Sequence, residues 1–179
     1  PFGAGNAYYS QFFRGKRFQY LRSRFPFREA WLDVLEVEWN GQRRQTAFLS
    51  IGLDAEVMRL SGERTQHGLR DYVRAGAAVA FKINTAYSVA VKILGKKKVH
   101  WENCVTLTLA KIPYIGYGLR SLIGNTKQDN GIIYGSAVVN RHSSQWNKVA
   151  RSWGLVLAQM SLEKPPLIPF QGKEIEISS

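Results

Sequence analysis

Hydrophobic and polar residues alternate along several short segments of this chain. Residues 35–39 read Leu-Glu-Val-Glu-Trp, which has the two-residue period of a half-buried strand. Asn40-Gly41 follows and supplies both positive-φ positions of a type I′ turn, so we expect a hairpin whose second strand runs over residues 44–51. A second hairpin is expected from residues 88–93 and 105–109, which alternate in the same way around a lysine-rich turn.

Apolar residues recur at helical spacing in two other segments. They share one face of a helix over residues 69–81, and again over residues 146–160. Strands are expected before and after the second helix, over residues 132–139 and 173–178. No internal repeat or low-complexity linker separates these segments. We therefore predict one β-rich α+β domain over residues 1–179, an antiparallel β-sandwich with a few helices.

Composition narrows the choice of partners. The 179 residues are 45% hydrophobic, enough for a core that buries about 70% of the unfolded surface. The net charge of +12 points to an anionic partner, such as nucleic acid, a membrane surface or a phosphate ligand.

The single cysteine, Cys104, excludes an intrachain disulfide and favours a reducing compartment, so a cytoplasmic protein is expected. The histidines lack metal-ligand spacing, and no window reaches the ~20 apolar residues of a membrane span.

One segment is both basic and aromatic. Residues 14–28 hold six Lys and Arg, no acidic residue and four interleaved aromatic side chains. Arg22, Arg24 and Arg28, together with the lysines at 96–98, could lie on anionic lipid headgroups, where each cation contributes about 1 kcal/mol. The same composition suits single-stranded nucleic acid, or a solvated face above buried phenylalanines.

Three motifs contain residues suited to phosphate and metal chemistry. The glycines of Gly3-Ala4-Gly5-Asn6 let backbone amides approach a phosphate, although ordinary turns use the same residues. In Gln128-Asp129-Asn130-Gly131, a carboxylate and an amide oxygen could bind Mg²⁺ or Ca²⁺, or cap a β-turn. An apolar strand runs directly into Gly52-Leu53-Asp54-Ala55. Asp54 of this motif could organise a substrate hydroxyl or bind nearby backbone amides.

In their order along the chain, these motifs and the glycine-containing segment 114–119 resemble the diacylglycerol kinase family of lipid kinases, which includes bacterial lipid kinases and sphingosine kinases. The resemblance covers essentially the whole chain. The sequence departs from the family pattern at Ala7, Gly124 and Asn130, where the family has Asp, Pro and a second Asp. The resemblance implies the second domain of a diacylglycerol-kinase-like fold, with residues 1–13 as a linker and glycine loop from a nucleotide-binding domain.

The resemblance also implies roles for individual residues. It implies that Gly3, Gly5 and Asn6 contact the phosphates of ATP or their metal. It implies a catalytic role for Asp54, and it implies that Gln128, Asp129 and Asn130 bind a metal ion. Weaker metal binding is expected because Asn130 removes a negative charge from the family pattern. The intact enzyme would use ATP and Mg²⁺ to phosphorylate a hydroxyl of a diacylglycerol- or sphingoid-like lipid.

Two further family motifs do not occur in this sequence, the Gly-Gly-Asp-Gly-Thr nucleotide loop and the Asp-Gly-Glu that carries the general base. We therefore expect a missing N-terminal nucleotide-binding domain and a general base outside this chain, so that this segment alone is inactive. As the lipid-binding half of the kinase, it would meet its lipid at an anionic membrane surface as a peripherally associated protein, with no nucleic acid partner. The alternative is a non-catalytic basic module that binds membranes or nucleic acid.

Overall fold

The computed structural model of the chain describes residues 31–62, 69–82, 87–116, 119–120, 123, 126–139 and 167–178. The helices of this part are α3 (Leu53–Gly62) and α4 (Leu69–Lys82). The strands, in chain order, are β1 (Leu35–Trp39), β2 (Gln42–Thr46), β3 (Phe48–Gly52), β4 (Tyr87–Ile93), β5 (Val99–Ala110), β6 (Tyr114–Gly116), β7 (Leu119–Arg120), β8 (Ile133–Val139), β9 (Leu167–Gly172) and β10 (Ile175–Ser178). The helix predicted over residues 146–160 lies outside the described residues.

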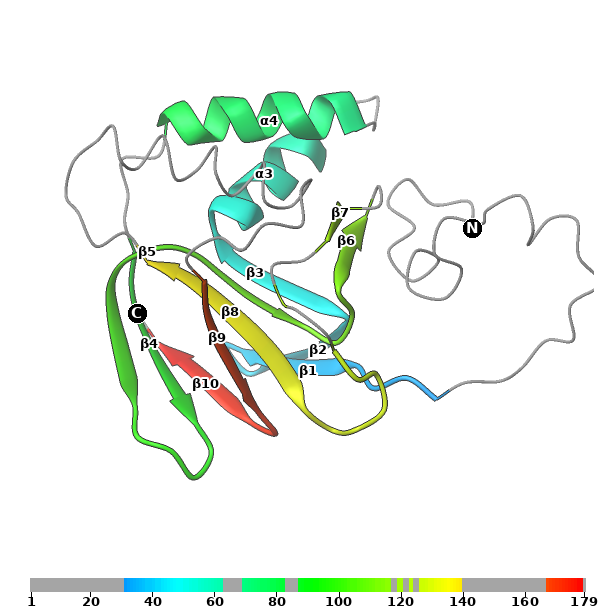
Figure 1. Cartoon of the computed structure of the whole chain (residues 1–179), viewed down its shortest axis with the longest axis vertical. Helices are drawn as coiled ribbons and strands as arrows, with labels where there is room; N and C mark the ends of the chain where they lie inside the picture. Colours follow the sequence, from blue (N-terminus) through cyan, green and yellow to red (C-terminus); the bar gives the residue numbers. More distant parts are fainter. Residues whose placement is uncertain are drawn as a thin grey trace, which may run out of the picture.

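A six-stranded antiparallel sheet organises this part of the chain (Figure 1). Its strands follow the order β10-β4-β5-β8-β9, and β3 also pairs with β5. The first half of β5 pairs with β4, from Val99 to Cys104, and its second half pairs with β3, from Thr106 to Ala110. The register with β8 shifts between Cys104 and Thr106, and Asn103 has a φ of 58°, as at a β-bulge. The predicted antiparallel, β-rich α+β class is confirmed.

The hairpin predicted at Asn40-Gly41 is confirmed, since β1 pairs with β2 and these residues have φ values of 49° and 73°. The prediction of one partner strand over residues 44–51 is wrong. The chain leaves β2 at Ala47, and β3 joins the six-stranded sheet. The Thr46 hydroxyl donates to the Phe48 carbonyl oxygen (2.8 Å) and accepts from the Phe48 backbone N–H (3.3 Å). This local bonding replaces ladder bonds where the chain changes sheets.

The second hairpin differs from its prediction in the pairing of its returning strand. β4 pairs with residues 99–104, whereas the predicted partner segment, residues 105–109, pairs with β3 and β8. Both segments belong to β5, and an alternating pattern does not show where a long strand changes partner. The helix predicted over residues 69–81 is confirmed as α4. α3 was not predicted from the sequence, because its apolar buried residues Leu53 and Val57 supply only one helical repeat.

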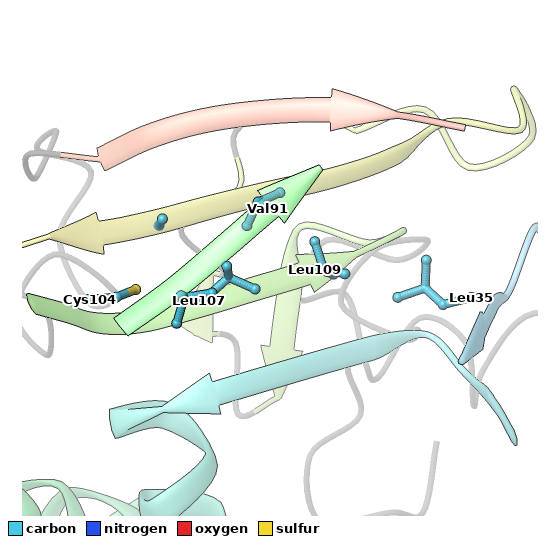
Figure 2. Packing of buried hydrophobic residues seen from close by; sticks show 7 residues of the cluster. Leu35, Val91, Cys104, Leu107 and Leu109 are labelled. Carbon is cyan, nitrogen blue, oxygen red and sulfur yellow. The ribbon is translucent and has the colours of Figure 1, made fainter. Parts of the chain in front are cut away.

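The apolar core combines side chains of the six-stranded sheet with Leu35 of β1 (Figure 2). Its buried members are Leu35, Val89, Val91, Cys104, Leu107, Leu109 and Ala137. Thr106 and Thr108 alternate with Leu107 and Leu109 along β5, so they point to the opposite face of the sheet. α3 lies at that face, and it packs against α4 at one end of the sheet.

Candidate functional site

The junction from Gly52 to Asp54 joins β3 to α3. Gly52 has a φ of 89°, and a Cβ at this position would overlap the Val105 carbonyl oxygen of β5. Only glycine allows both this backbone angle and this close approach. The chain therefore leaves β3 directly against β5, and α3 begins at the next residue.

Asp54 lies in the first turn of α3 and is 5% exposed. The Thr108 hydroxyl donates to Asp54 Oδ2 over 3.2 Å, and Ser50 Oγ lies 3.4 Å from Thr108 Oγ1. The N-terminus of a helix favours a negative charge. α3, β5 and β3 thus contribute one polar side chain each to a group that we call the Asp54 cluster, which consists of Asp54, Thr108 and Ser50.

The Asp54 cluster is suited to orienting hydroxyl groups. An ionised carboxylate has acceptor atoms only, so every partner must donate a proton to it. The Thr108 hydroxyl already does so at Oδ2. A carboxylate held in this way can align a second hydroxyl, which is the requirement for an alcohol that attacks a phosphoryl group.

Glu56, two residues beyond Asp54, is engaged in an ion pair on the surface of α3. Its carboxylate oxygens lie 2.9 Å and 2.6 Å from the Arg59 guanidinium nitrogens Nε and Nη2. The hydrogen bond from Arg59 lowers the pKa of Glu56. This exposed pair is a local feature of the helix, so we assign Glu56 no part in the site.

A second polar cluster lies at the end of β5. Lys111 Nζ is 2.8 Å from Asp33 Oδ2, 2.7 Å from the Ile132 carbonyl oxygen and 3.2 Å from Asn130 Oδ1. Lys111 is only 2% exposed. We call these four residues the Lys111 cluster. Lys111 follows Thr108 by three residues, or roughly 10 Å along an extended chain.

Asp33 ties the loop before β8 to the segment before β1. The Asp33 backbone N–H donates to the Gln128 carbonyl oxygen (2.8 Å), and the Gly131 backbone N–H donates to Asp33 Oδ2 (2.7 Å). The hydrogen bond from Lys111, followed by that from Gly131, lowers the pKa of Asp33. The Asp33 carboxylate is therefore held ionised at neutral pH, with donors from two other segments.

The predicted metal ligands lie in this loop, but their arrangement does not fit a divalent ion at Asn130. Asn130 Oδ1 accepts from the Lys111 ammonium, Gln128 bonds through its backbone, and Asp129 is exposed. A metal ion at Asn130 Oδ1 would meet a buried positive charge. Within the described ranges, no group of three or more His, Cys, Asp or Glu side chains could hold a metal. These side-chain types do not include the amides of Gln128 and Asn130, so a metal at Gln128, Asp129 and Asn130 stays a prediction.

The other predicted site residues fall into two groups. One group lies outside the described residues: Gly3, Gly5, Asn6, Arg22, Arg24 and Arg28. The lysines at 96–98 lie at the turn between β4 and β5, where they are exposed. Leu94 and Val99 flank this turn with exposed fractions of 65% and 45%. None of the helices that the structure describes is long and apolar enough to cross a bilayer.

Four side chains of these clusters were not predicted from the sequence: Ser50, Thr108, Asp33 and Lys111. Lys111 carried a usable signal, because it is a single lysine inside an apolar segment and lysine is almost never fully buried unless it is paired. Ser50 and Thr108 carried none, since they are 58 residues apart and hydroxyl residues are common in strands. Their role becomes visible only when β3 pairs with β5.

No protein-family model and no curated protein matches this chain. Among solved structures, it is similar to a diacylglycerol kinase from Bacillus anthracis, with 20% sequence identity and a TM-score of 0.47 over 82% of this chain and 44% of that one. Another structure from the same bacterium, which bears this kinase name provisionally, shows 19% identity and a TM-score of 0.46 over 77% of this chain and 43% of the other. The chain thus spans less than half the length of these structures. The kinase class for which they are named is the one that the sequence motifs resemble.

Proposed function

We propose that this chain is the lipid-binding half of an ATP-dependent lipid kinase, which phosphorylates a hydroxyl of a diacylglycerol- or sphingoid-like lipid. The observation that carries this proposal is the junction from Gly52 to Asp54. There, a turn that only glycine can make delivers a buried carboxylate to the Thr108 hydroxyl on a neighbouring strand. The hydrogen bond from the Thr108 hydroxyl to Asp54 supports a role for the Gly-x-Asp-Ala motif in orienting a hydroxyl group, as an acceptor alcohol requires.

In this proposal Asp54 orients the acceptor hydroxyl of the lipid. Phosphoryl transfer depends mainly on placing the acceptor oxygen in line with the γ-phosphate and on offsetting charge, with little covalent chemistry by the protein. Gly3, Gly5 and Asn6 are assigned to binding the phosphates of ATP, which enters with Mg²⁺. The nucleotide-binding domain and the general base belong to the rest of the protein.

The lipid is reached at an anionic membrane surface, through a peripheral contact that includes the tip of the β4–β5 hairpin. Lysines 96–98 are exposed there between the exposed apolar residues Leu94 and Val99. Lysines at such a tip attract anionic headgroups, while apolar side chains beside them enter the interface. Three arginines of the basic and aromatic segment are proposed to add to this contact: Arg22, Arg24 and Arg28.

The test uses protein expressed from the complete reading frame, with ATP, Mg²⁺ and vesicles that contain diacylglycerol or sphingosine. We expect transfer of the γ-phosphoryl group to the lipid hydroxyl. Asp54→Asn keeps the shape of the side chain and removes its charge, so kcat should fall by about 100-fold or more, as misplaced reactants usually cause. The melting temperature and the KM for ATP should stay close to those of the unaltered protein.

Asp71→Asn is the matched control, because Asp71 is a carboxylate in the first turn of α4. It should retain the activity. A protein that binds vesicles but transfers no phosphoryl group to either lipid would contradict the proposal and favour a non-catalytic membrane module. If Asp54→Asn lost stability in proportion to activity, Asp54 would have a structural role only.

A further inference from the structure

The Lys111 ammonium is fully paired inside the protein. It has three N–H donors, and three oxygens surround it: Asp33 Oδ2 at 2.8 Å, the Ile132 carbonyl oxygen at 2.7 Å and Asn130 Oδ1 at 3.2 Å. These separations are those of N–H···O hydrogen bonds. The pairing explains how a lysine can be 2% exposed without the cost of an isolated buried charge.

The same oxygens are of the kinds that a hard divalent cation binds. Carboxylate, backbone carbonyl and amide oxygens hold Ca²⁺ or Mg²⁺ in proteins, at about 2.0–2.6 Å. In the Lys111 cluster such oxygens converge on an ammonium instead. The ring of Tyr134 adds a further contact suited to an organic cation, with its centroid 5.7 Å from Nζ.

The charges of the cluster also favour one univalent cation. Asp33 contributes one negative charge and Lys111 one positive charge, while Asn130 contributes an oxygen without charge. A divalent ion at Asn130 Oδ1 would lie next to the Lys111 ammonium, which is 2% exposed, and the two like charges would repel each other. Asn130, where the resembled family has Asp, therefore suits the ammonium better than it suits a metal ion.

We propose that the Lys111 ammonium is the resident cation of the loop over residues 128–132 and fills the place that a divalent metal ion would take. It joins three parts of the chain: the segment before β1 through Asp33, the end of β5, and the loop before β8 through Asn130 and Ile132. The loop then keeps its position without Mg²⁺ or Ca²⁺. This inference concerns the loop itself and does not depend on lipid phosphorylation.

The first experiment measures the melting temperature of the unaltered 179-residue chain with Mg²⁺, with Ca²⁺ and with EDTA. At about 10 mM, an ion exceeds the dissociation constant of the weakest protein Ca²⁺ sites, about 1 mM, by tenfold. Binding to the folded state would then raise the melting temperature by about 3 °C or more. We expect changes below about 1 °C with either ion and with EDTA. A rise with Mg²⁺ or Ca²⁺, or a fall with EDTA, would overturn the proposal.

The second experiment compares Lys111→Met with Lys92→Met by amide hydrogen exchange. Lys92 pairs with Glu176 at the surface, so its substitution is a matched control for the loss of a lysine charge. Lys111→Met keeps the aliphatic stem and removes the cation, so the amides of residues 130–132 should exchange at least about tenfold faster. Lys92→Met should leave them unchanged. Unaltered exchange of these amides in Lys111→Met would overturn the proposal. If Lys111→Met does not fold, the melting temperatures of the unaltered chain with Mg²⁺, Ca²⁺ and EDTA still test the proposal.

A third experiment exchanges the two cations. Lys111→Met combined with Asn130→Asp removes the ammonium and places a second carboxylate beside Asp33 and the Ile132 carbonyl oxygen. Ca²⁺ at about 10 mM should now raise the melting temperature by about 3 °C or more. The single variant Asn130→Asp retains Lys111 and should gain no such response. If the double variant were indifferent to Ca²⁺, the ammonium and the metal would not share one place.

Discussion

At the residue scale, Asp54 and Lys111 are buried ionisable side chains, 5% and 2% exposed, whose hydrogen-bonding partners lie on other segments. Removing a partner from a buried ion leaves an uncompensated charge and is strongly destabilising. Each of these residues therefore constrains where its partners lie. Asp54 holds α3 to β5 through Thr108, and Lys111 holds the loop before β8 to the segment before β1 through Asp33.

Gly52→Ala should be among the most destabilising substitutions in the described part of the chain. A Cβ there overlaps the backbone of β5 and also meets a φ of 89°, so we expect the free energy of unfolding to fall by about 3 kcal/mol or more. Gly95→Ala is the control, because it has a φ of 76° but open space around it, and should cost only about 1–2 kcal/mol. Urea denaturation measures both, and equal losses would show that the close approach to β5 is unimportant.

Cys104 should be unreactive in the folded protein. Burial raises the pKa of its thiol to about 11, so the thiolate fraction at pH 8 is about 0.1%. Iodoacetamide should therefore modify Cys104 at least about 100-fold more slowly in buffer than in concentrated urea. Similar rates in both solutions would place the thiol at the surface.

The same shift gives Cys104 a defined effect on stability. The folded pKa is above the ordinary value of 9.0, so the unfolded state loses this proton first as the pH rises. Cys104 therefore has no effect below about pH 8 and lowers the free energy of unfolding progressively between about pH 9 and 11. Cys104→Ala should remove this part of the alkaline loss, which urea denaturation at pH 8 and pH 10 would measure.

At the element scale, β5 positions both clusters. It pairs with β4 and then with β3 along one edge and with β8 along the other. Cys104 and Leu107 both belong to the apolar core, although residues three apart point to opposite faces of a regular strand. The bulge between Cys104 and Thr106 inserts the extra residue that reconciles their directions. Beyond the bulge, Thr108 is left to face Asp54.

The tip of the β4–β5 hairpin is the element for which we predict membrane contact. Replacing the three lysines at 96–98 by Glu should weaken binding to phosphatidylserine vesicles by about 100-fold or more, since each lysine near an anionic surface contributes about 1 kcal/mol. The binding of the unaltered protein should fall steeply as salt is added. Vesicle co-sedimentation measures both effects.

The control for this prediction changes charge elsewhere by the same amount. Arg44, Arg70 and Arg74 are exposed on β2 and α4, and their replacement by Glu should leave most of the vesicle binding intact. If both triple variants lost binding equally, net charge and not the hairpin tip would be responsible. Tighter binding to single-stranded nucleic acid than to vesicles at the same salt concentration would favour the nucleic-acid module.

At the scale of the whole molecule, segments from distant parts of the sequence meet in one sheet. β10, at residues 175–178, pairs with β4, and Leu35 of β1 contributes to the core around β5. The sheet therefore cannot be complete until the last described strand has joined it. Long-range pairing of this kind makes unfolding cooperative and folding comparatively slow.

Leu107→Ala tests whether this core stabilises the molecule as one unit. Leu107 is completely buried at the centre of the sheet, so its truncation should lower the free energy of unfolding by about 2–5 kcal/mol. Leu94→Ala makes the same chemical change at a side chain that is 65% exposed, and it should stay within about 0.5 kcal/mol. Fluorescence and circular dichroism should report one shared transition for Leu107→Ala. Two separate transitions would show that the sheet and the helices unfold independently.

The sequence by itself determined the elements whose signals are local. The alternation of apolar and polar residues and the Asn40-Gly41 turn identified the first hairpin. Apolar residues at helical spacing identified α4. Together, these patterns indicated an antiparallel, β-rich class. The Gly-x-Asp-Ala motif also directed attention to Asp54. These features depend on backbone angles and on side-chain periods that neighbouring residues set.

Only the tertiary structure decided which strands pair and which polar groups meet. Whether residues 105–109 pair with β4 or with β3 depends on packing between segments far apart in the chain, which alternation does not encode. Thr108 and Asp33 look like ordinary strand and loop residues until β3 lies against β5 and the loop before β8 reaches the segment before β1. Asn130 is a further example. Its neighbours in sequence suggested a metal ligand, and only the tertiary structure places the Lys111 ammonium beside its Oδ1.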